Sequence, residues 1–309
     1  MSESKTVAAS TAGETTLLIV DGQVDFHPGG SLEVPDADKD AKRIADLILS
    51  SISDPSEPMI HRIVATMDSH HKLHIAHPSF WVSKDTNQHP DPFTMILSKD
   101  IKDGKWVPRK DLNLPTHEKL VYPELIGMEE DGLLDNNGEF DILAYCIKYT
   151  EMLENSGKFS LIIWPEHCLI GTPGHCIHET IREAMDEWCD QTGRSVEFVM
   201  KGQNLLTEMY SVFRAEVAIS PDTSLNKTLL DSIMTSNRIL VCGQALTHCV
   251  NHTARDLIDY MKGEEHKVEI LADCSSSITG FEEDAEKFLQ YISSNGGKVS
   301  QDCTQVFEN

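Results

Sequence analysis

The sequence predicts an α/β protein with three layers, α-β-α, built on a six-stranded, mainly parallel sheet. Short apolar and β-branched runs alternate with longer amphipathic segments from residue 16 to residue 292. Because each crossover between parallel strands needs a helix that packs on the sheet, this alternation indicates a parallel sheet covered on both faces. Reactive residues also follow directly after the apolar runs, where ligands bind in open α/β sheets.

Each element is expected from its local pattern: strands from short runs of apolar and β-branched residues, helices from amphipathic segments of ten residues or more. In the first half we expect strand 16–20, helix 38–52, strand 62–66, helix 142–154 and strand 159–163. In the second half we expect helix 175–189, strand 196–200, helix 225–234, strand 239–241, helix 249–261, strand 268–271 and helix 282–292.

Residues 82–145 interrupt this alternation between the second strand and the next helix. The segment is rich in turn-forming residues, such as the run His89-Pro90-Asp91-Pro92-Phe93. Its length and content predict an inserted subdomain or a lid, and a contact between subunits or a decorated surface is the alternative. We therefore expect a single domain over residues 1–309 with an insertion at about residues 82–145.

Composition excludes several classes of partner. The chain has 309 residues and a formal net charge of −24, so its field repels nucleic acid and anionic membrane surfaces. No apolar run approaches the length of a membrane span, and no signal peptide is visible. The eight cysteines show neither CxxC pairs nor zinc-finger spacing. We expect a protein of the reducing cytoplasm, without a nucleic-acid or membrane partner.

Chemically capable residues stand at the end of every predicted strand. They are Asp21, Asp68, Trp164 with His167, Lys201, the run 243–249, and Asp273. Asp273 is the exception, since it suits a turn or a cap. A carboxylate, a lysine and a thiol at three strand ends of one sheet can converge, and together they supply a base, a fixed cation and a nucleophile.

Cys249 is the candidate nucleophile. An apolar run breaks at Gly243 and delivers the Cys249 thiol to the start of a predicted helix. The unpaired N–H groups of a helix N-terminus favour a thiolate and can hold an oxyanion. The alternative is a buried structural thiol, which is the better interpretation for Cys242.

Five segments together resemble the isochorismatase-like cysteine hydrolases, whose best-known members are nicotinamidases. They occur in the family's order and span most of the chain. They are Val20-Asp21-Gly22-Gln23-Val24-Asp25-Phe26, Ala65-Thr66-Met67-Asp68-Ser69-His70, Trp164-Pro165-Glu166-His167-Cys168, Lys201-Gly202 with Tyr210-Ser211-Val212-Phe213, and residues 243–249. Two departures concern the substrate: shorter members have no segment like residues 82–145, and residues 244–249 read Gln-Ala-Leu-Thr-His-Cys.

The resemblance implies a role for each catalytic residue. Asp21 would be the general base, Lys201 would hold that carboxylate and favour the thiolate, and Cys249 would attack an amide carbonyl to form a thioester. The backbone N–H groups of Ala245 and Cys249 would face the oxyanion. By the same resemblance, the peptide bond between Gln244 and Ala245 is expected to be cis.

The resemblance also implies a divalent metal held by Asp68, His70 and His167. One carboxylate and two imidazoles suit Zn²⁺ best, with Mn²⁺ or Fe²⁺ as alternatives and waters completing the shell. A further histidine near His74 often helps to order the site in this family.

His71 and His77 crowd the same loop as the expected metal ligands. We interpret both as surface or packing residues. Phe26 and Trp164 match positions that line the ring pocket in nicotinamidases, with core packing as the alternative role.

The leading hypothesis is a metal-containing cysteine amidohydrolase that acts on a small flat amide, with nicotinamide to nicotinate and ammonia as the first guess. A second hypothesis keeps the fold and changes the substrate to a ureido, carbamoyl or other small amide. A third is a binder of a metal or metabolite without catalysis, and the isochorismatase reaction, which does not need the cysteine, is less favoured. The resemblance implies a homo-oligomer.

Overall fold

A computed structural model describes residues 13–114, 121–157 and 160–308. Its centre is a six-stranded sheet in the order β10-β9-β8-β1-β2-β7, in which every neighbouring pair is parallel. The strands are β1 (Thr15–Val20), β2 (Arg62–Asp68), β7 (Glu197–Lys201), β8 (Arg238–Gly243), β9 (Val268–Leu271) and β10 (Lys298–Ser300). The predicted parallel α/β sheet is confirmed.

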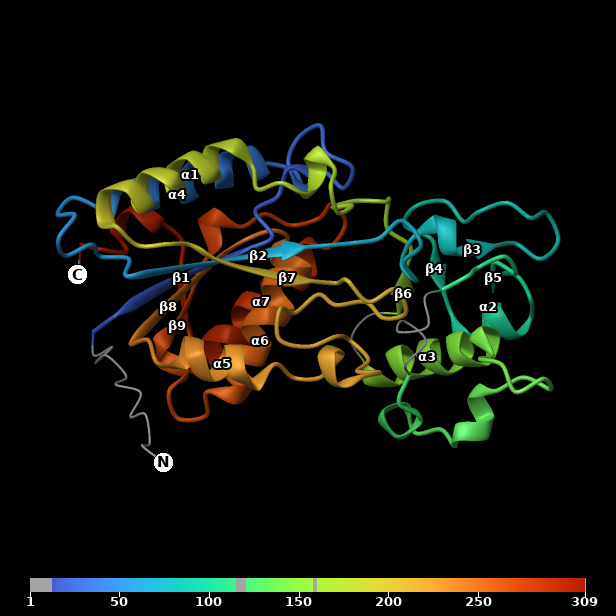
Figure 1. The fold of residues 1–309 in the computed structure, drawn as a ribbon. Coiled ribbons are helices and arrows are strands. Elements are labelled where there is room, and N and C mark those ends of the chain that lie inside the picture. The colour runs from blue at the N-terminus through green and yellow to red at the C-terminus, as the bar shows by residue number, and fades with distance from the viewer. Residues whose placement is uncertain (1–12, 115–120, 158–159, 309) are drawn as a thin grey trace, which may run out of the picture.

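Helices cover both faces of the sheet, as Figure 1 shows. One face carries α1 (Ala37–Ser50) and α4 (Glu179–Thr192), and the other carries α5 (Lys227–Met234), α6 (Asn251–Tyr260) and α7 (Glu282–Ser294). Each face has its own cluster of buried apolar side chains. The three layers follow from the sequence because each amphipathic segment had to bury one face against the sheet.

Strand β1 shows why the apolar runs are continuous. All six of its residues are buried. Leu17 and Ile19 join the apolar cluster under α1 and α4, whereas Leu18 and Val20 join the cluster on the other face. Successive side chains of a strand point to opposite faces, so a strand covered on both sides favours an unbroken apolar run, here residues 17–20.

Helix α1 packs through residues at helical spacing. Ala41, Ile44, Ala45 and Ile48 are all buried, whereas Lys39 and Lys42 point into solvent. Positions three and four apart lie on the same side of a helix, so these four form one apolar stripe. The stripe lies against the sheet beside α4.

One predicted strand lies outside the main sheet. Of residues 160–163, only Leu161–Ile162 form a strand, β6, which pairs antiparallel with β4 (Met95–Ile96), and Phe159 lies outside the described residues. The backbone of this segment forms hydrogen bonds with the insertion instead of the main sheet; for example, Ile163 N–H donates to Thr94 O at 2.8 Å.

The sixth strand of the main sheet is β10, which the sequence did not predict. Its three residues are exposed or half-buried, and it pairs with β9 only. A short strand at the edge of a sheet needs no apolar run, so the pattern gave no signal there.

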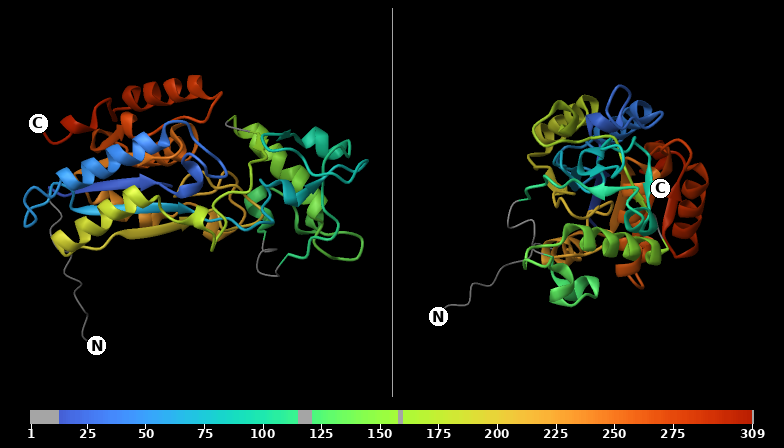
Figure 2. Two further views of the ribbon diagram at one scale, coloured as in Figure 1. Left: turned by 90° about the horizontal axis from the view of Figure 1, so that it is seen from above. Right: turned by 90° about the vertical axis from the view of Figure 1, so that its right-hand side faces the viewer.

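The insertion forms a lobe at the end of the sheet toward which the strands point (Figures 1 and 2). It contains β3 (Trp81–Val82), α2 (Ser98–Lys102) and β5 (Val107–Pro108), and leads into α3 (Ile142–Ser156). None of the helices in the described part of the chain combines the length and apolar character that crossing a bilayer requires.

Helix α3 joins the lobe to the segment that follows β7. Tyr145 Oη donates to Leu206 O at 2.5 Å, and Glu208 N–H donates to Tyr149 Oη at 2.9 Å. All four of these residues are buried. The lobe therefore supports the 205–210 segment from behind.

Candidate active site

Three strand ends bring a carboxylate, an ammonium and a thiol into contact. Asp21 follows β1, Lys201 ends β7, and Cys249 lies in a π-helical turn (Leu246–Val250) that leads into α6. Lys201 Nζ lies 2.8 Å from Asp21 Oδ2 and 3.4 Å from Cys249 Sγ. The spatial convergence expected from the sequence is present.

Lys201 is a buried cation between two carboxylates. Its side chain is 0% exposed, and Nζ also lies 3.1 Å from Asp68 Oδ1. Burial alone would lower the pKa of Lys201, but the charges of Asp21 and Asp68 outweigh burial and raise it well above its usual range. Burial raises the pKa of Asp21, and Lys201 opposes that rise. Lys201 is therefore a permanent positive charge beside a carboxylate whose basicity burial increases.

The thiol of Cys249 is held as a thiol rather than a thiolate. Burial raises the pKa of Cys249 well above its usual range, and Lys201 only partly opposes this. The sequence suggested that a helix N-terminus would favour the thiolate, but the side chain is buried among apolar residues, where a thiolate loses its hydration. A base must therefore take the proton when the sulfur reacts.

The loop before Cys249 is shaped by close backbone contacts. Gly243 has φ of 116°, and a Cβ there would lie 1.9 Å from Val20 O, so only glycine fits. The peptide bond between Gln244 and Ala245 is cis, as expected. The N–H of Ala245 makes no hydrogen bond to the residues that the structure describes, and Ala245 lines the same pocket as Cys249.

Asp68, His70 and His167 form a cluster suited to a metal. One ligand atom from each lies within 4.8 Å of the others, and all three residues are buried. His70 Nε2 lies 3.0 Å and His167 Nε2 lies 3.4 Å from Asp68 Oδ2. The ligand set predicted from the sequence is therefore assembled in one place.

The tautomers of the two histidines also fit a metal. His70 Nδ1 lies 3.0 Å from Gly202 O, and His167 Nδ1 lies 2.7 Å from Pro165 O. A carbonyl oxygen only accepts, so each Nδ1 carries a proton and each Nε2 points toward Asp68, where it could bind a cation once it is deprotonated. Two ring nitrogens and one carboxylate oxygen directed at the same point fit a divalent cation.

Gly202 allows the cluster to form. It has φ of 73°, and a Cβ there would lie 2.7 Å from Asp68 Oδ1 and 2.9 Å from His70 Cε1. A side chain at this position would displace two of the three candidate ligands. Steric space beside Asp68 and His70 therefore explains why a glycine follows Lys201.

The neighbouring histidines take the surface and packing positions predicted for them. His71 is exposed. His77 is buried, and its ring centroid lies 5.2 Å from that of His70 and 5.6 Å from that of His167. His74 is buried, and its ring contacts those of His70 and His77. Its Nε2 lies 3.1 Å from Thr207 O. His74 and His77 thus pack against the metal cluster from outside.

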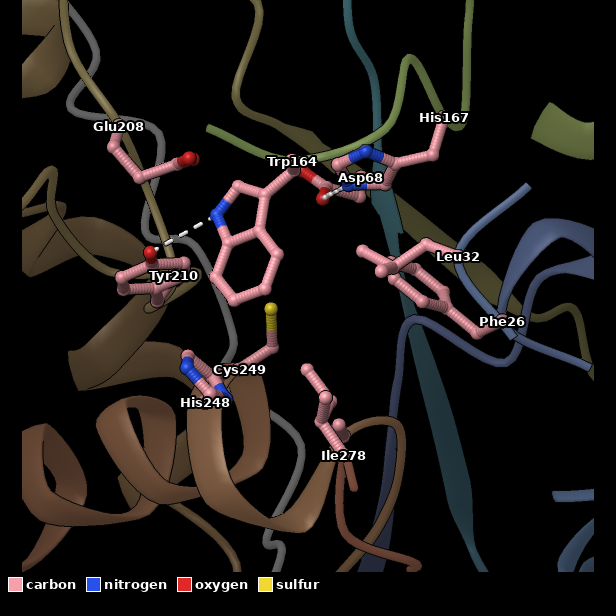
Figure 3. Close-up of a pocket in the computed structure, with 11 residues that line it drawn as sticks. Phe26, Leu32, Asp68, Trp164, His167, Glu208, Tyr210, His248, Cys249 and Ile278 are labelled. Carbon is pink, nitrogen blue, oxygen red and sulfur yellow. Dashed lines mark hydrogen bonds and ion pairs between the residues drawn. The ribbon is translucent and has the colours of Figure 1, made fainter. Parts of the chain in front are cut away.

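Cys249, Asp68 and His167 open onto one pocket with aromatic walls (Figure 3). Trp164 stands above the thiol, and its Nε1 donates to Tyr210 Oη at 3.1 Å. The lining residues are Phe26, Leu32, Asp68, Trp164, His167, Glu208, Tyr210, Ala245, His248, Cys249 and Ile278. Phe26 and Trp164 line the pocket as the resemblance implied, and both also pack in the core.

The sequence interpretation missed Glu208 and His248. Glu208 is 4% exposed, and burial raises the pKa of its carboxyl group. His248 precedes Cys249 directly, and burial lowers its pKa to about 3. The available signals were an acid two residues before Tyr210 and a histidine beside the nucleophile, within the run 243–249. Only the folded loops show that both side chains line the pocket.

Two parts of the sequence interpretation do not contribute to the pocket. Of the described residues in 82–145, none lines it. Asp273 stays away from it and accepts a hydrogen bond from Cys303 N–H at 2.9 Å, which suits the turn role that was its alternative.

Solved structures of nicotinamidases share this architecture over almost their whole length. The nicotinamidase/pyrazinamidase of Acinetobacter baumanii is 19% identical, with a TM-score of 0.57 and coverage of 96% of this chain and 99% of that chain. The yeast nicotinamidase is 20% identical, with a TM-score of 0.58 and coverage of 94% and 100%. This chain has the nicotinamidase fold. The yeast enzyme has also been solved with the inhibitor nicotinaldehyde, at a TM-score of 0.57 and 20% identity over 94% of this chain and 100% of that chain.

No protein-family model and no curated protein sequence matches the chain. At these identities the structural likeness establishes the fold, and the residues of the pocket must carry any argument about chemistry. Within the nicotinamidase fold, this chain places its acid, lysine and thiol at the carboxyl ends of β1 and β7 and in the turn after β8.

Proposed function

We propose that the protein is a cysteine amidohydrolase that cleaves a small flat amide, with nicotinamide as the first substrate to test. The observation that carries this proposal is the contact of buried Lys201 Nζ with both Asp21 Oδ2 and Cys249 Sγ, at a pocket that Cys249 lines. A binding protein has no need of a thiol paired with a buried base and a buried cation. Nucleophilic catalysis needs all three.

The first half of the reaction makes a thioester. Asp21 takes the thiol proton while Cys249 Sγ bonds to the amide carbon, and the electron pair of the carbonyl moves onto its oxygen, facing the N–H groups of Ala245 and Cys249. Lys201 stays protonated and balances the charge near Asp21. The carbonyl re-forms as the C–N bond breaks, and Asp21 returns its proton to the leaving nitrogen, so ammonia departs.

The second half releases the acid. Asp21 takes a proton from a water molecule, whose oxygen attacks the thioester carbon. The C–S bond then breaks and the sulfur recovers a proton from Asp21. The raised pKa of Asp21 suits this repeated exchange, because a carboxylate in water is a weak base for a thiol.

Asp68, His70 and His167 would hold the divalent metal, with Zn²⁺ as the first choice and Mn²⁺ or Fe²⁺ as alternatives. When bound, the ion would supply a Lewis acid for a ring nitrogen of the substrate or for a water. The His70 and His167 tautomers fixed by backbone carbonyls support this assignment.

The pocket favours a small, flat substrate. Its walls leave a cavity of about 20 Å³, so the lining side chains must move apart to admit a ligand. Aromatic faces suit a planar ring. A ureido substrate is the second candidate, because the buried carboxyl of Glu208 offers an acceptor for an additional N–H group.

Ammonia release from nicotinamide, pyrazinamide and a panel of ureido compounds tests the proposal. Activity on at least one should vanish in Cys249→Ala and persist in Cys176→Ala, which removes an exposed thiol. Full activity in Cys249→Ala contradicts the mechanism. Absence of activity on every compound, together with equal alkylation of Cys249 and Cys176, favours a binding protein.

The cellular setting and assembly are proposals that rest on the sequence. Every cysteine is a free thiol, which suits a reducing cytoplasm. A homo-oligomer follows from the family resemblance, and light scattering on the purified protein tests it. We propose that residues 82–145 act as a subdomain supporting the pocket, because Tyr145 and Tyr149 bind the segment that carries Glu208.

A further inference from the structure

A second cluster of metal-ligand residues lies on the opposite face of the sheet from the pocket. Asp273 and Cys274 form the turn after β9, and Cys303 begins the turn after β10. One carboxylate oxygen and the two Sγ atoms lie within 4.8 Å of one another. Cys274 and Cys303 belong to the apolar cluster under α1 and α4, whereas Cys249 belongs to the cluster on the other face.

The carboxylate of this cluster has one unsatisfied oxygen. Asp273 Oδ2 accepts from Cys303 N–H at 2.9 Å, but Asp273 Oδ1 is buried and makes no hydrogen bond within the described residues. A buried polar atom without a partner is rare and unfavourable. This oxygen is therefore available to a bound ligand.

The two thiols are also positioned as ligands. Cys274 is 0% and Cys303 is 4% exposed. The hydrogen bond to Cys303 and burial together raise the pKa of Cys274. A cation that displaced the thiol protons would be bound by both sulfurs and by a carboxylate oxygen of Asp273.

We propose that Asp273, Cys274 and Cys303 bind a thiophilic divalent cation of the Zn²⁺ class, with water in the fourth position of a tetrahedral shell. On binding, the two thiol protons pass to solvent and the thiolates and carboxylate coordinate the ion. The site then carries one net negative charge, which Arg43 offsets, since its Nη1 donates to Asp273 O at 3.0 Å. Two sulfurs and one oxygen suit Zn²⁺ better than Mg²⁺ or Ca²⁺.

A disulfide between Cys274 and Cys303 is the competing explanation. It would consume both sulfurs and leave the carboxylate of Asp273 out of the contact, whereas a cation would be bound by all three residues. The cation would also fasten the C-terminal segment to the sheet, next to the hydrogen bond from Arg238 Nη1 to Val306 O at 2.7 Å. Its role is therefore structural and does not depend on the proposed amidase activity.

Cobalt titration of the reduced, metal-free, full-length protein tests the site. Co²⁺ bound by thiolates gives charge-transfer absorption in the near ultraviolet, and the cluster of Asp68, His70 and His167 has no sulfur to produce it. We expect this absorption in the wild type, saturating at about one equivalent of thiolate-bound ion, and its loss in Cys274→Ser and Cys303→Ser. Cys249→Ser should retain it, which separates this site from the thiol beside Asp68.

Asp273→Asn provides a second variant that keeps both thiols and the side-chain shape. Its affinity for Co²⁺ should fall by about tenfold or more, because a neutral amide is a weaker ligand. Circular dichroism confirms that each variant is folded. Absence of the absorption in the wild type, its survival in Cys303→Ser, or a Cys274–Cys303 cross-link in the protein as purified would overturn the proposal.

Discussion

Lys201 Nζ lies 3.4 Å from Cys249 Sγ, in a position where its side chain has no access to solvent. The two residues are 48 positions apart in sequence and come from β7 and from the turn after β8. The same ammonium also contacts Asp21 and Asp68. One buried cation therefore connects the candidate nucleophile, the candidate base and a candidate metal ligand, and its removal should disturb all three.

Lys201→Met should destabilise the protein as well as inactivate it. The substitution leaves Asp21 and Asp68 buried without their common counter-ion, and breaking a buried ion pair of this kind costs about 3–5 kcal/mol. Urea unfolding measures the loss. Lys39→Met is the control, because its ion pair with Asp36 is exposed and screened by solvent, so its loss should change stability little. Equal effects of the two substitutions would contradict the central position of Lys201.

Gly202→Ala should reduce metal binding. The new Cβ would meet Asp68 Oδ1 and His70 Cε1 at less than van der Waals distance. Gly263→Ala is the matched control, because Gly263 also has positive φ but nothing within 4 Å of the position of a Cβ. Both variants carry backbone strain of about 1–2 kcal/mol. Elemental analysis should find less bound metal in Gly202→Ala alone, and a similar content in both would count against the proposed ligands.

Thr66→Val should shift the pH dependence of activity. Thr66 Oγ1 donates to Asp21 Oδ1 at 2.6 Å, and this hydrogen bond lowers the pKa of Asp21 against the larger effect of burial. Without the hydroxyl the pKa of Asp21 rises further, so the base becomes protonated at higher pH. The acidic limb of the kcat/KM profile should move to higher pH, while Thr66→Ser should keep the wild-type profile. An unchanged limb in Thr66→Val would mean that Asp21 is not the group that titrates.

His27→Gln should make stability less dependent on pH. His27 stacks on His178 with ring centroids 4.2 Å apart, and burial lowers the pKa of His27 from 6.5 to about 4. The unfolded chain therefore binds a proton at a pH where the folded chain does not, and stability falls as pH decreases from 6.5 toward 4. This loss amounts to on the order of 3 kcal/mol and should be absent in His27→Gln.

The control for His27→Gln is His71→Gln, which removes an exposed imidazole. Urea unfolding at a series of pH values compares the two variants with the wild type. If His27→Gln shows the same acid-induced loss as His71→Gln, other groups cause it.

The sequence was sufficient for the fold class and for bringing Asp21, Asp68 and Lys201 to strand ends, although it missed β10 and placed residues 159–163 in the main sheet. Strand β1 is continuously apolar from Leu17 to Val20, and α1 carries its buried residues at helical spacing, so local pattern specified both. Asp21, Asp68 and Lys201 stand at strand ends, where parallel topology brings side chains together without any need to know the loops. These inferences succeed because hydrophobic burial repeats along the chain with the period of each element.

The contributions of Glu208, His248 and the cluster of Asp273, Cys274 and Cys303 could be found only in three dimensions. Each depends on where an irregular loop or a short edge strand comes to rest, and no periodic pattern encodes that. Protonation followed the same rule: the sequence suggested a thiolate at Cys249, but the folded pocket excludes the water that would stabilise one. Neighbours in sequence determine which elements form, whereas solvent exclusion and long-range contacts determine the charge and reactivity of the groups they carry.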